Sequence, residues 1–130
     1  MQYGVQNGSF LAAGGEEGLF SLATDFYHQM ETLPQAQLIR SMHPDDLTQS
    51  IDKLASFLSG WLGGPKLYRE KYGSISIPRA HQHLKISVKE QDAWLLCMHQ
   101  ALQNTDYPED FKQYLLKQLA VPASRCVNCE

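Results

Sequence analysis

The segment from Leu47 to Pro65 carries the pattern that most limits how this chain can fold. Its apolar side chains recur every three or four residues, at Leu47, Ile51, Leu54, Phe57, Leu58 and Trp61. That period is typical of one face of an α-helix, and the Gly63-Gly64-Pro65 run that follows ends a helix sharply. We therefore expect an amphipathic helix that buries one face against other elements.

The same period occurs before and after this segment. It predicts a helix over 16–31 and a short helix over 35–42, which stops before Pro44 because the residue before a proline avoids the α-helical region. Between residues 66 and 86 the pattern weakens, and only short helical turns are expected, near Tyr68 and His81.

Two further helices are expected in the last third of the chain. Ser87 and Glu90 have the spacing of a capping box, which starts a helix that carries Trp94. Pro108 fits the first position of a last helix, which runs toward Pro122. Because no two apolar segments alternate as paired strands would, the expected fold class is all-α, with helix packed on helix.

Composition narrows the class of protein. The 130 residues are 43% hydrophobic and 19% charged, which predicts one globular domain over 1–130 with a flexible tail from about 122 to 130. A net charge of −3 without a basic cluster disfavours nucleic acid as a partner. No apolar run reaches the length of about 18 residues that crosses a bilayer, and the N-terminus does not resemble a signal peptide. We therefore expect no membrane partner and a cytoplasmic location.

Few residues suggest chemistry by spacing alone. The five histidines include no pair with zinc-site spacing, and a lone histidine on a helical chain is most often a surface or capping residue. No nucleophile motif or phosphate-binding loop is present. Cys126 and Cys129 form a two-residue-spaced pair near the end, but they lack a second pair for a metal and a strand-to-helix turn for redox work, which favours a frayed tail.

Three separated segments carry a joint pattern: Phe26-Tyr27 after a glycine-rich start, FLSGWLGGP at 57–65 followed by Leu67-Tyr68 and Lys71-Tyr72-Gly73, and DAWLLCM at 92–98. Together they resemble the group II truncated haemoglobins. Their order and spacing hold from about Gly14 to Leu102 without a gap, and the last helix fits more loosely. The resemblance implies a shortened globin fold, a two-over-two helical sandwich around a haem.

The resemblance also implies roles for single residues. The family's iron-binding histidine corresponds to His81, and its distal tyrosine and tryptophan correspond to Tyr27 and Trp94. A position that usually holds tyrosine or phenylalanine holds His43 here. Further residues expected in the haem pocket are Phe26, Ser50, Leu54, Phe57, Ile86 and Met98, with Tyr72, Arg79 and Lys85 as candidate partners of the haem propionates.

The run Pro78-Arg79-Ala80-His81-Gln82-His83-Leu84 departs from the family pattern. Many relatives have an arginine just before the proximal histidine and a Pro-Phe pair shortly after it. Here the arginine is displaced and His83 takes the place of the proline. His83 is therefore a rival to His81 as the iron ligand.

The chemistry of these residue types agrees with a haem site. A neutral imidazole is a good axial ligand for haem iron. Bound dioxygen gains negative charge on its outer atom, and the Tyr27 hydroxyl and Trp94 indole N–H are donors suited to it. On periodicity alone, both residues fit equally well as core aromatics with a satisfied polar tip.

His43 has two interpretations. In one it only packs over the haem edge. In the other its imidazole donates to Tyr27 or to the ligand, and His43 or Tyr27 swings onto the iron when no ligand is bound. An imidazole titrates near an unperturbed pKa of about 6.5, so the second interpretation makes ligand binding depend on pH near neutrality.

The expected cofactor is one non-covalent haem b, since no Cys-x-x-Cys-His is present to attach a c-type haem. The expected ligands are oxygen, nitric oxide, carbon monoxide or peroxide. Oxygen binding and storage is the leading function. The alternatives are nitric-oxide dioxygenation or peroxide detoxification with a reductase as partner, a haem-based sensor or interaction module, and a helical domain without a cofactor.

Overall fold

The computed structural model describes residue 3 and residues 6–73 and 86–127. Its helices are α1 (Gly8–Ala12), α2 (Gly15–Thr32), the 3-10 helix η1 (Pro34–Ala36), α3 (Gln37–Ser41), α4 (Thr48–Trp61), α5 (Leu67–Tyr72), α7 (Val88–Gln103) and α8 (Glu109–Arg125). No strand occurs in these ranges. The predicted all-α class is confirmed. The helical turn expected near His81 lies outside the described residues.

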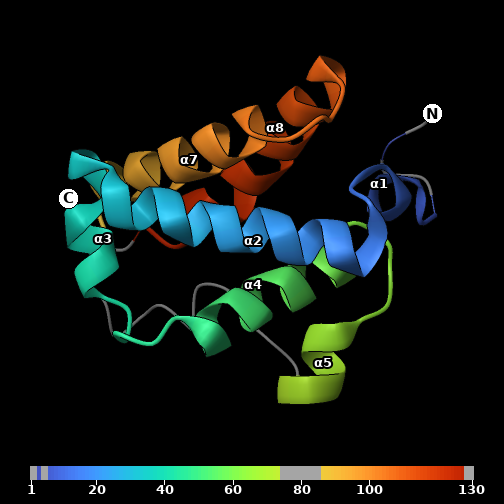
Figure 1. The fold of residues 1–130 in the computed structure, drawn as a ribbon, viewed down its shortest axis with the longest axis horizontal. Coiled ribbons are helices and arrows are strands. Elements are labelled where there is room, and N and C mark those ends of the chain that lie inside the picture. The colour runs from blue at the N-terminus through green and yellow to red at the C-terminus, as the bar shows by residue number, and fades with distance from the viewer. Residues whose placement is uncertain (1–2, 4–5, 74–85, 128–130) are drawn as a thin grey trace.

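The helices form two layers that α2 joins (Figure 1). On one side α2 packs against α4, and on the other it packs against α7, which in turn pairs with α8. The fully buried side chains between the layers include Leu19, Phe26, Met30, Met98, Leu102, Phe111, Leu115 and Leu119. Each of these lies on the apolar stripe of α2, α7 or α8, so the stripes build one common core.

The end of α4 is fixed by the two glycines that the sequence analysis singled out. Gly64 N–H donates to the Ser59 carbonyl at 2.8 Å and Gly63 N–H to the Gly60 carbonyl at 3.2 Å, which together form a Schellman motif. Gly63 has φ of +89°, a conformation that favours glycine. The short helix α1, which the sequence analysis missed, packs here because Phe10 N–H donates to the Leu62 carbonyl at 3.1 Å.

The capping box predicted at the start of α7 is confirmed. Ser87 Oγ accepts from Lys89 N–H at 3.2 Å, and Glu90 Oε1 accepts from Ser87 N–H at 2.9 Å. Two otherwise unpaired backbone donors are satisfied in this way, which stabilises the first turn of the helix that carries Trp94.

The end of α8 corrects the sequence analysis. Residues 122–125 were expected to belong to a tail, but α8 continues through Pro122 to Arg125. A proline inside a helix costs about 3 kcal/mol or more because it lacks an N–H. Burial of apolar side chains offsets this cost at about 1.5–3 kcal/mol each, and both Leu119 and Pro122 are buried. At the other end, Pro108 is the N-cap residue and α8 begins one residue later, at Glu109.

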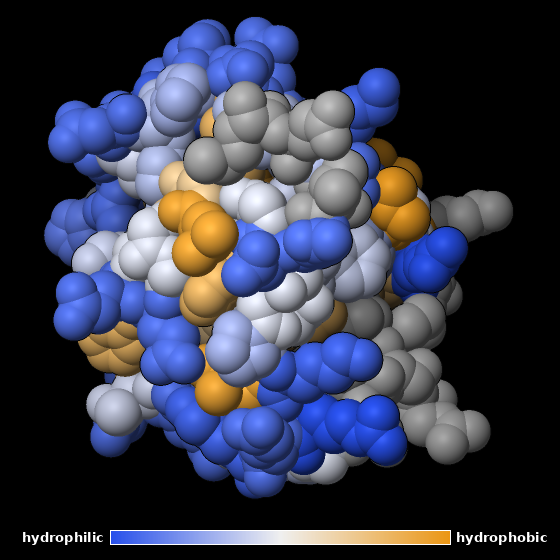
Figure 2. All heavy atoms as spheres, turned by 90° about the vertical axis from the view of Figure 1, so that its right-hand side faces the viewer, coloured by the Kyte–Doolittle hydropathy of each residue, from blue (hydrophilic) through white to orange (hydrophobic). Residues whose placement is uncertain are grey.

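The surface of the molecule carries both hydrophilic and hydrophobic side chains. The face in Figure 2, which is the right-hand side of Figure 1, is mostly hydrophilic, and its hydrophobic groups form small separate areas. None of the helices in 6–73 and 86–127 is long and apolar enough to cross a membrane.

We predict that Gly63→Ala destabilises the fold more than Gly15→Ala. Both glycines have positive φ, at +89° and +70°, so alanine costs about 1–2 kcal/mol of backbone strain at either position. At Gly63 an added Cβ would also overlap the Gln6 carbonyl oxygen, whereas at Gly15 it meets only the Phe10 ring at 3.9 Å. Urea unfolding of both variants measures the difference, and equal losses would show that the approach of Gln6 to Gly63 does not matter.

Candidate functional site

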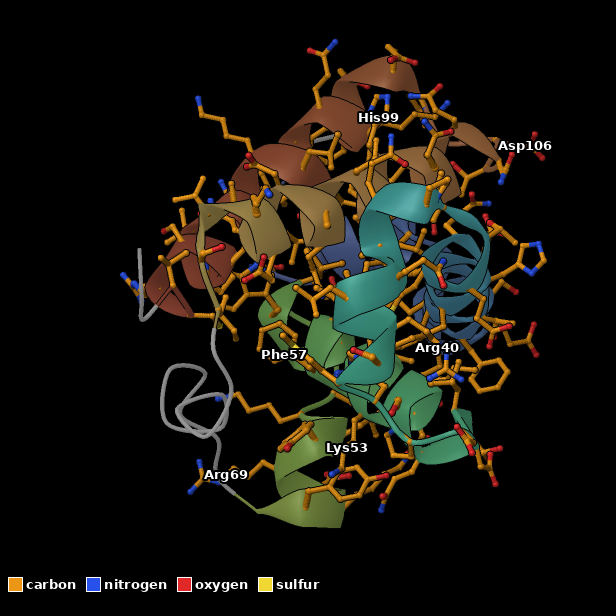
Figure 3. All side chains as sticks on the ribbon, turned by 90° about the vertical axis from the view of Figure 1, so that its left-hand side faces the viewer. Arg40, Lys53, Phe57, Arg69, His99 and Asp106 are labelled. Atoms are coloured by element: carbon orange, nitrogen blue, oxygen red, sulfur yellow. The ribbon has the colours of Figure 1, made fainter. Side chains whose placement is uncertain are left out.

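A cavity of about 360 Å³ is lined by residues of α2, α3, α4, α5, α7 and α8 and of the segments beside them. Figure 3, which turns the left-hand side of Figure 1 toward the viewer, labels Phe57 and Lys53 among the lining residues. The lining residues between positions 6 and 73 are Tyr27, Ile39, Met42, His43, Ser50, Lys53, Leu54, Phe57 and Tyr68. Those between positions 86 and 127 are Ile86, Glu90, Gln91, Trp94, Leu119, Pro122, Ala123 and Cys126.

Helical spacing explains which residues reach the cavity. On α4, Ser50, Lys53, Leu54 and Phe57 follow the steps of three and four residues that keep side chains on one face. On α8 and its C-cap, the residues 119, 122, 123 and 126 follow the same steps. One continuous face of α4 and one of α8 thus contribute to the walls of the cavity, and Leu54, Phe57 and Leu119 on these faces suit a flat apolar ligand.

Three residues with polar groups form what we call the polar end of the cavity, namely Tyr27, His43 and Trp94. Tyr27 comes from α2, Trp94 from α7, and His43 from the segment just after α3. The Tyr27 and His43 rings lie 5.4 Å apart between centroids at 73°. These three residues were predicted together from the sequence, and the fold brings all three to one cavity.

The Phe26 ring packs against the rings of both Tyr27 and Trp94. Its ring centroid is 5.0 Å from that of Tyr27, edge to face, and 4.9 Å from that of Trp94. Such tilted pairs are favourable contacts beyond the area that they bury. Phe26 is fully buried and does not line the cavity itself, so it sets the positions of the Tyr27 and Trp94 rings.

The surroundings of Tyr27 keep its hydroxyl protonated. The residue is 7% exposed, and burial raises the pKa of its phenol well above the ordinary value of 10.0 because the charged form is poorly solvated. Tyr27 is therefore a neutral hydrogen-bond donor near neutral pH.

The backbone of α3 fixes the tautomer of His43. Its Nδ1 lies 2.8 Å from the Ile39 carbonyl oxygen. A carbonyl only accepts, so Nδ1 carries the proton in the neutral ring and Nε2 carries the lone pair. Neutral His43 is thus an acceptor through Nε2, and it becomes a donor there only when protonated.

Several polar residues on the cavity wall were not predicted from the sequence. Lys53, Tyr68, Glu90 and Gln91 all line it, as does the Cys126 thiol. Lys53 could have been found from its place beside Leu54 on the α4 stripe. Tyr68 could not, because nothing in its local sequence indicates which way α5 turns.

Other predicted site residues lie elsewhere. Met98 is fully buried in the core, and the Tyr72 hydroxyl donates to Asp52 Oδ2 at 2.6 Å. Neither lines the cavity. His81, His83, Arg79 and Lys85 lie outside the described residues. Within the described ranges no three histidine, cysteine or acidic side chains gather to hold a metal ion.

The residues present fit a haem. Leu54 and Phe57 offer an apolar wall to a macrocycle, and the polar end offers donors to a small ligand beside it. Lys53 places a cation on the wall, the charge that a carboxylate-bearing group requires.

The comparisons with known proteins agree with this fit. The family model of the bacterial-like globins matches residues 9–127. The group 2 truncated haemoglobin YjbI of Bacillus subtilis (strain 168) is 33% identical over 114 residues, which are 88% of this chain and 84% of that protein.

Solved structures give the same result. A cold-adapted truncated haemoglobin from the Antarctic marine bacterium Pseudoalteromonas haloplanktis TAC125 is 30% identical with a TM-score of 0.89, covering 94% of this chain and 98% of that one. The group II 2-on-2 haemoglobin of Agrobacterium tumefaciens is 34% identical with a TM-score of 0.87, covering 94% and 95%.

The predicted two-over-two globin fold is confirmed by these structures. The family implies a haem cofactor and gaseous ligands such as oxygen. This chain belongs to the bacterial-like globin family, within the group II truncated haemoglobins.

Proposed function

We propose that this chain binds oxygen and related diatomic ligands reversibly on a haem b held in the cavity. The observation that carries the proposal is the polar end, where side chains from three separate elements of an all-helical fold line one cavity. A core needs no such gathering of polar groups, because buried polar atoms cost free energy unless they have partners.

When bound, the haem would supply an iron that takes up a small diatomic ligand. Within the proposal His81 is the protein ligand of that iron, as the family resemblance implies. Lys53 is the described cation on the cavity wall that fits a propionate. The thioether-forming motif of c-type haem is absent from the sequence, so the attachment is non-covalent.

Tyr27 and Trp94 are the proposed donors to the diatomic ligand. The Tyr27 phenol stays protonated because it is buried, and the Trp94 indole N–H can only donate. Phe26 keeps both rings against the cavity. Donors that are fixed in advance stabilise charge on a ligand without reorganising.

We predict that His81→Gly loses haem or binds it only when imidazole is supplied. His83→Gly is the matched control, two residues away, and it should retain haem. Absorption spectra of the two purified variants, with and without added imidazole, make the comparison. Loss of haem from the His83 variant alone would exchange the roles of the two histidines.

We predict that Tyr27→Phe and Trp94→Phe each raise the oxygen dissociation rate. A hydrogen bond to a charged or strongly polar acceptor contributes about 1.5–3 kcal/mol, which corresponds to about 10- to 150-fold in rate. The double variant should show less than the product of the two effects, since both residues address one ligand. Stopped-flow measurement gives the rates, and unchanged rates in both single variants would remove these residues from the site.

We further propose that His43 makes ligand binding depend on pH. With Nδ1–H held on the Ile39 carbonyl, neutral His43 presents a lone pair at Nε2, which can accept from Tyr27 or bind the iron. Protonated His43 can do neither, and it becomes a donor. Acid should therefore favour an iron that is open to the ligand.

Spectra and ligand-association rates between about pH 5 and pH 8, a range that spans an ordinary imidazole pKa, test this proposal. The native chain should change across the range, and His43→Phe should not. The same pH profile in both proteins would leave His43 as a packing residue only.

A redox role, nitric-oxide dioxygenation or peroxide detoxification, is the second candidate, because donors that hold bound oxygen also polarise bound peroxide. It requires a reductase to return the iron to the ferrous state, and this partner is part of the proposal. Slow oxygen dissociation without turnover favours storage, whereas steady consumption of nitric oxide or peroxide with a reductant favours the enzyme. The cytoplasmic location expected from the sequence stays a prediction.

A further inference from the structure

Two tyrosines of α5 are in ring contact, and one of them lines the cavity. Tyr68 lines the cavity, and its ring centroid lies 5.1 Å from that of Tyr72, one helical turn further on. Tyr72 Oη donates to Asp52 Oδ2 on α4 at 2.6 Å. These three side chains form a continuous path from the cavity wall to a carboxylate whose side chain is 34% exposed.

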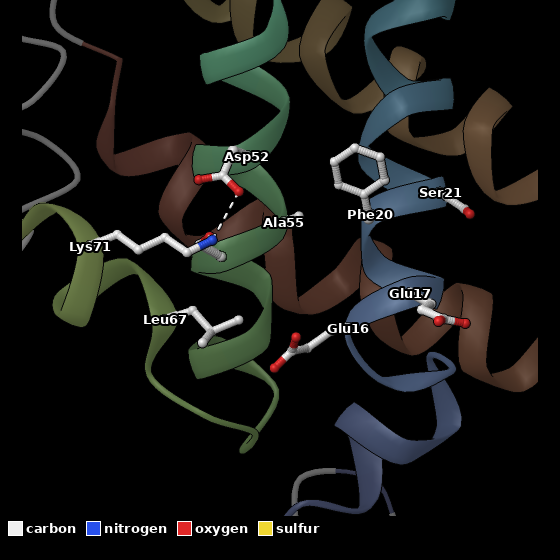
Figure 4. Close-up of a pocket in the computed structure, with 9 residues that line it drawn as sticks. Glu16, Glu17, Phe20, Ser21, Asp52, Ala55, Leu67 and Lys71 are labelled. Atoms are coloured by element: carbon white, nitrogen blue, oxygen red, sulfur yellow. Dashed lines mark hydrogen bonds and ion pairs between the residues drawn. The ribbon is translucent and has the colours of Figure 1, made fainter.

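The Asp52 carboxylate is ionised and accepts the hydrogen bond of the Tyr72 hydroxyl, so it lies where the Tyr72 proton can go. Lys71 Nζ lies 2.9 Å from Oδ1, the oxygen that Tyr72 does not use (Figure 4). The hydrogen bond from Tyr72, and then that from Lys71, lower the pKa of Asp52, so the carboxylate is ionised near neutral pH. A tyrosine that loses an electron becomes a strong acid, and a carboxylate at hydrogen-bond distance can take its proton at once.

The other described tyrosine on the cavity wall lacks the carboxylate partner that Tyr72 has. The Tyr72 hydroxyl donates to Asp52, a bond that also raises the pKa of the Tyr72 phenol, whereas no acidic side chain of the described residues accepts from Tyr27. Tyr3 also donates to a carboxylate, that of Asp110 at 3.1 Å, but it does not line the cavity. Among the described tyrosines, therefore, the pair Tyr68 and Tyr72 combines contact with the cavity and a carboxylate acceptor.

Asp52 also faces a second, open hollow of about 500 Å³ between α2 and α4 (Figure 4). The Phe20 ring lines this hollow and is 52% exposed, and Leu67 lines it from α5. An aromatic molecule of small size can pack on Phe20 and reach the Asp52 carboxylate from solvent.

We propose that Tyr68, Tyr72 and Asp52 form a one-electron relay through which the haem-loaded chain oxidises small phenols at its surface when hydrogen peroxide is supplied. The inference rests on the proposed function, because it needs a haem in the cavity. It adds a second site, the hollow beside Asp52, to the cavity that binds the diatomic ligand.

The reaction balances with peroxide as the oxidant. Reduction of one hydrogen peroxide to two waters takes two electrons and two protons. Each electron leaves Tyr72 and passes through Tyr68 toward the cavity, while the phenolic proton of Tyr72 passes to Asp52. A phenol in the hollow then returns an electron to Tyr72, Asp52 returns the proton, and the phenol releases its own proton and leaves as a phenoxyl radical. Two phenols thus become two phenoxyl radicals for each peroxide consumed.

Radical trapping with peptide mapping tests the relay. The haem-loaded chain is treated with hydrogen peroxide and 2-methyl-2-nitrosopropane, which adds to tyrosyl radicals, and adducts are located by mass spectrometry. We expect the main adduct on Tyr72. Tyr72→Phe should lose this adduct and slow the oxidation of guaiacol, and Asp52→Asn should lose most of the adduct although the Tyr72 ring is still present. Tyr3→Phe, which removes the other tyrosine–aspartate pair, should behave as the native chain.

Each result bears on one claim. Adducts mainly on Tyr27 or Trp94, or a Tyr72 adduct that is unchanged in Asp52→Asn, would overturn the relay. Circular dichroism shows whether the variants keep their helices, and Tyr72→Phe serves if Asp52→Asn does not fold. A chain that takes up no haem overturns the proposed function itself, and its absorption spectrum reveals this before peroxide is added.

Discussion

The packing of Phe26 between Tyr27 and Trp94 is the contact on which the site depends. Phe26 is fully buried where α2 meets α7, with its ring about 5 Å from each neighbour. It is part of the apolar core and also the support of two polar side chains. Burial of the Phe26 ring in the core therefore also fixes the positions of the Tyr27 and Trp94 side chains. The cavity needs no separate element to position these two donors.

The walls of the cavity likewise use helix faces that also build the core. The apolar stripes of α4 and α8 bury part of their length in the core and leave the rest facing the cavity. For this reason Leu54 and Phe57 could be predicted at the site from helical spacing together with the family resemblance. The period alone does not separate a core residue from a wall residue, which is why Met98 was predicted at the pocket and lies in the core.

Long-range contacts account for most of what the sequence did not reveal. Local signals were sufficient for the bounds of α2 and α4 and for the capping box of α7. The continuation of α8 past Pro122 was not predicted, because burial against other elements outweighs the local cost of the proline. In the same way, the partner of Tyr72 is Asp52, twenty residues away in the sequence, and the tautomer of His43 depends on the Ile39 carbonyl.

Quenching of tryptophan fluorescence by haem tests most directly whether this cavity is the haem site. The chain has two tryptophans. Trp94 lines the cavity, and Trp61 is 40% exposed at the end of α4. In Trp61→Phe only Trp94 remains, and titration with haem should quench its emission to completion at one haem per chain, together with the appearance of a haem absorption band. Emission that persists at saturation, or a spectrum that never saturates, would contradict the account.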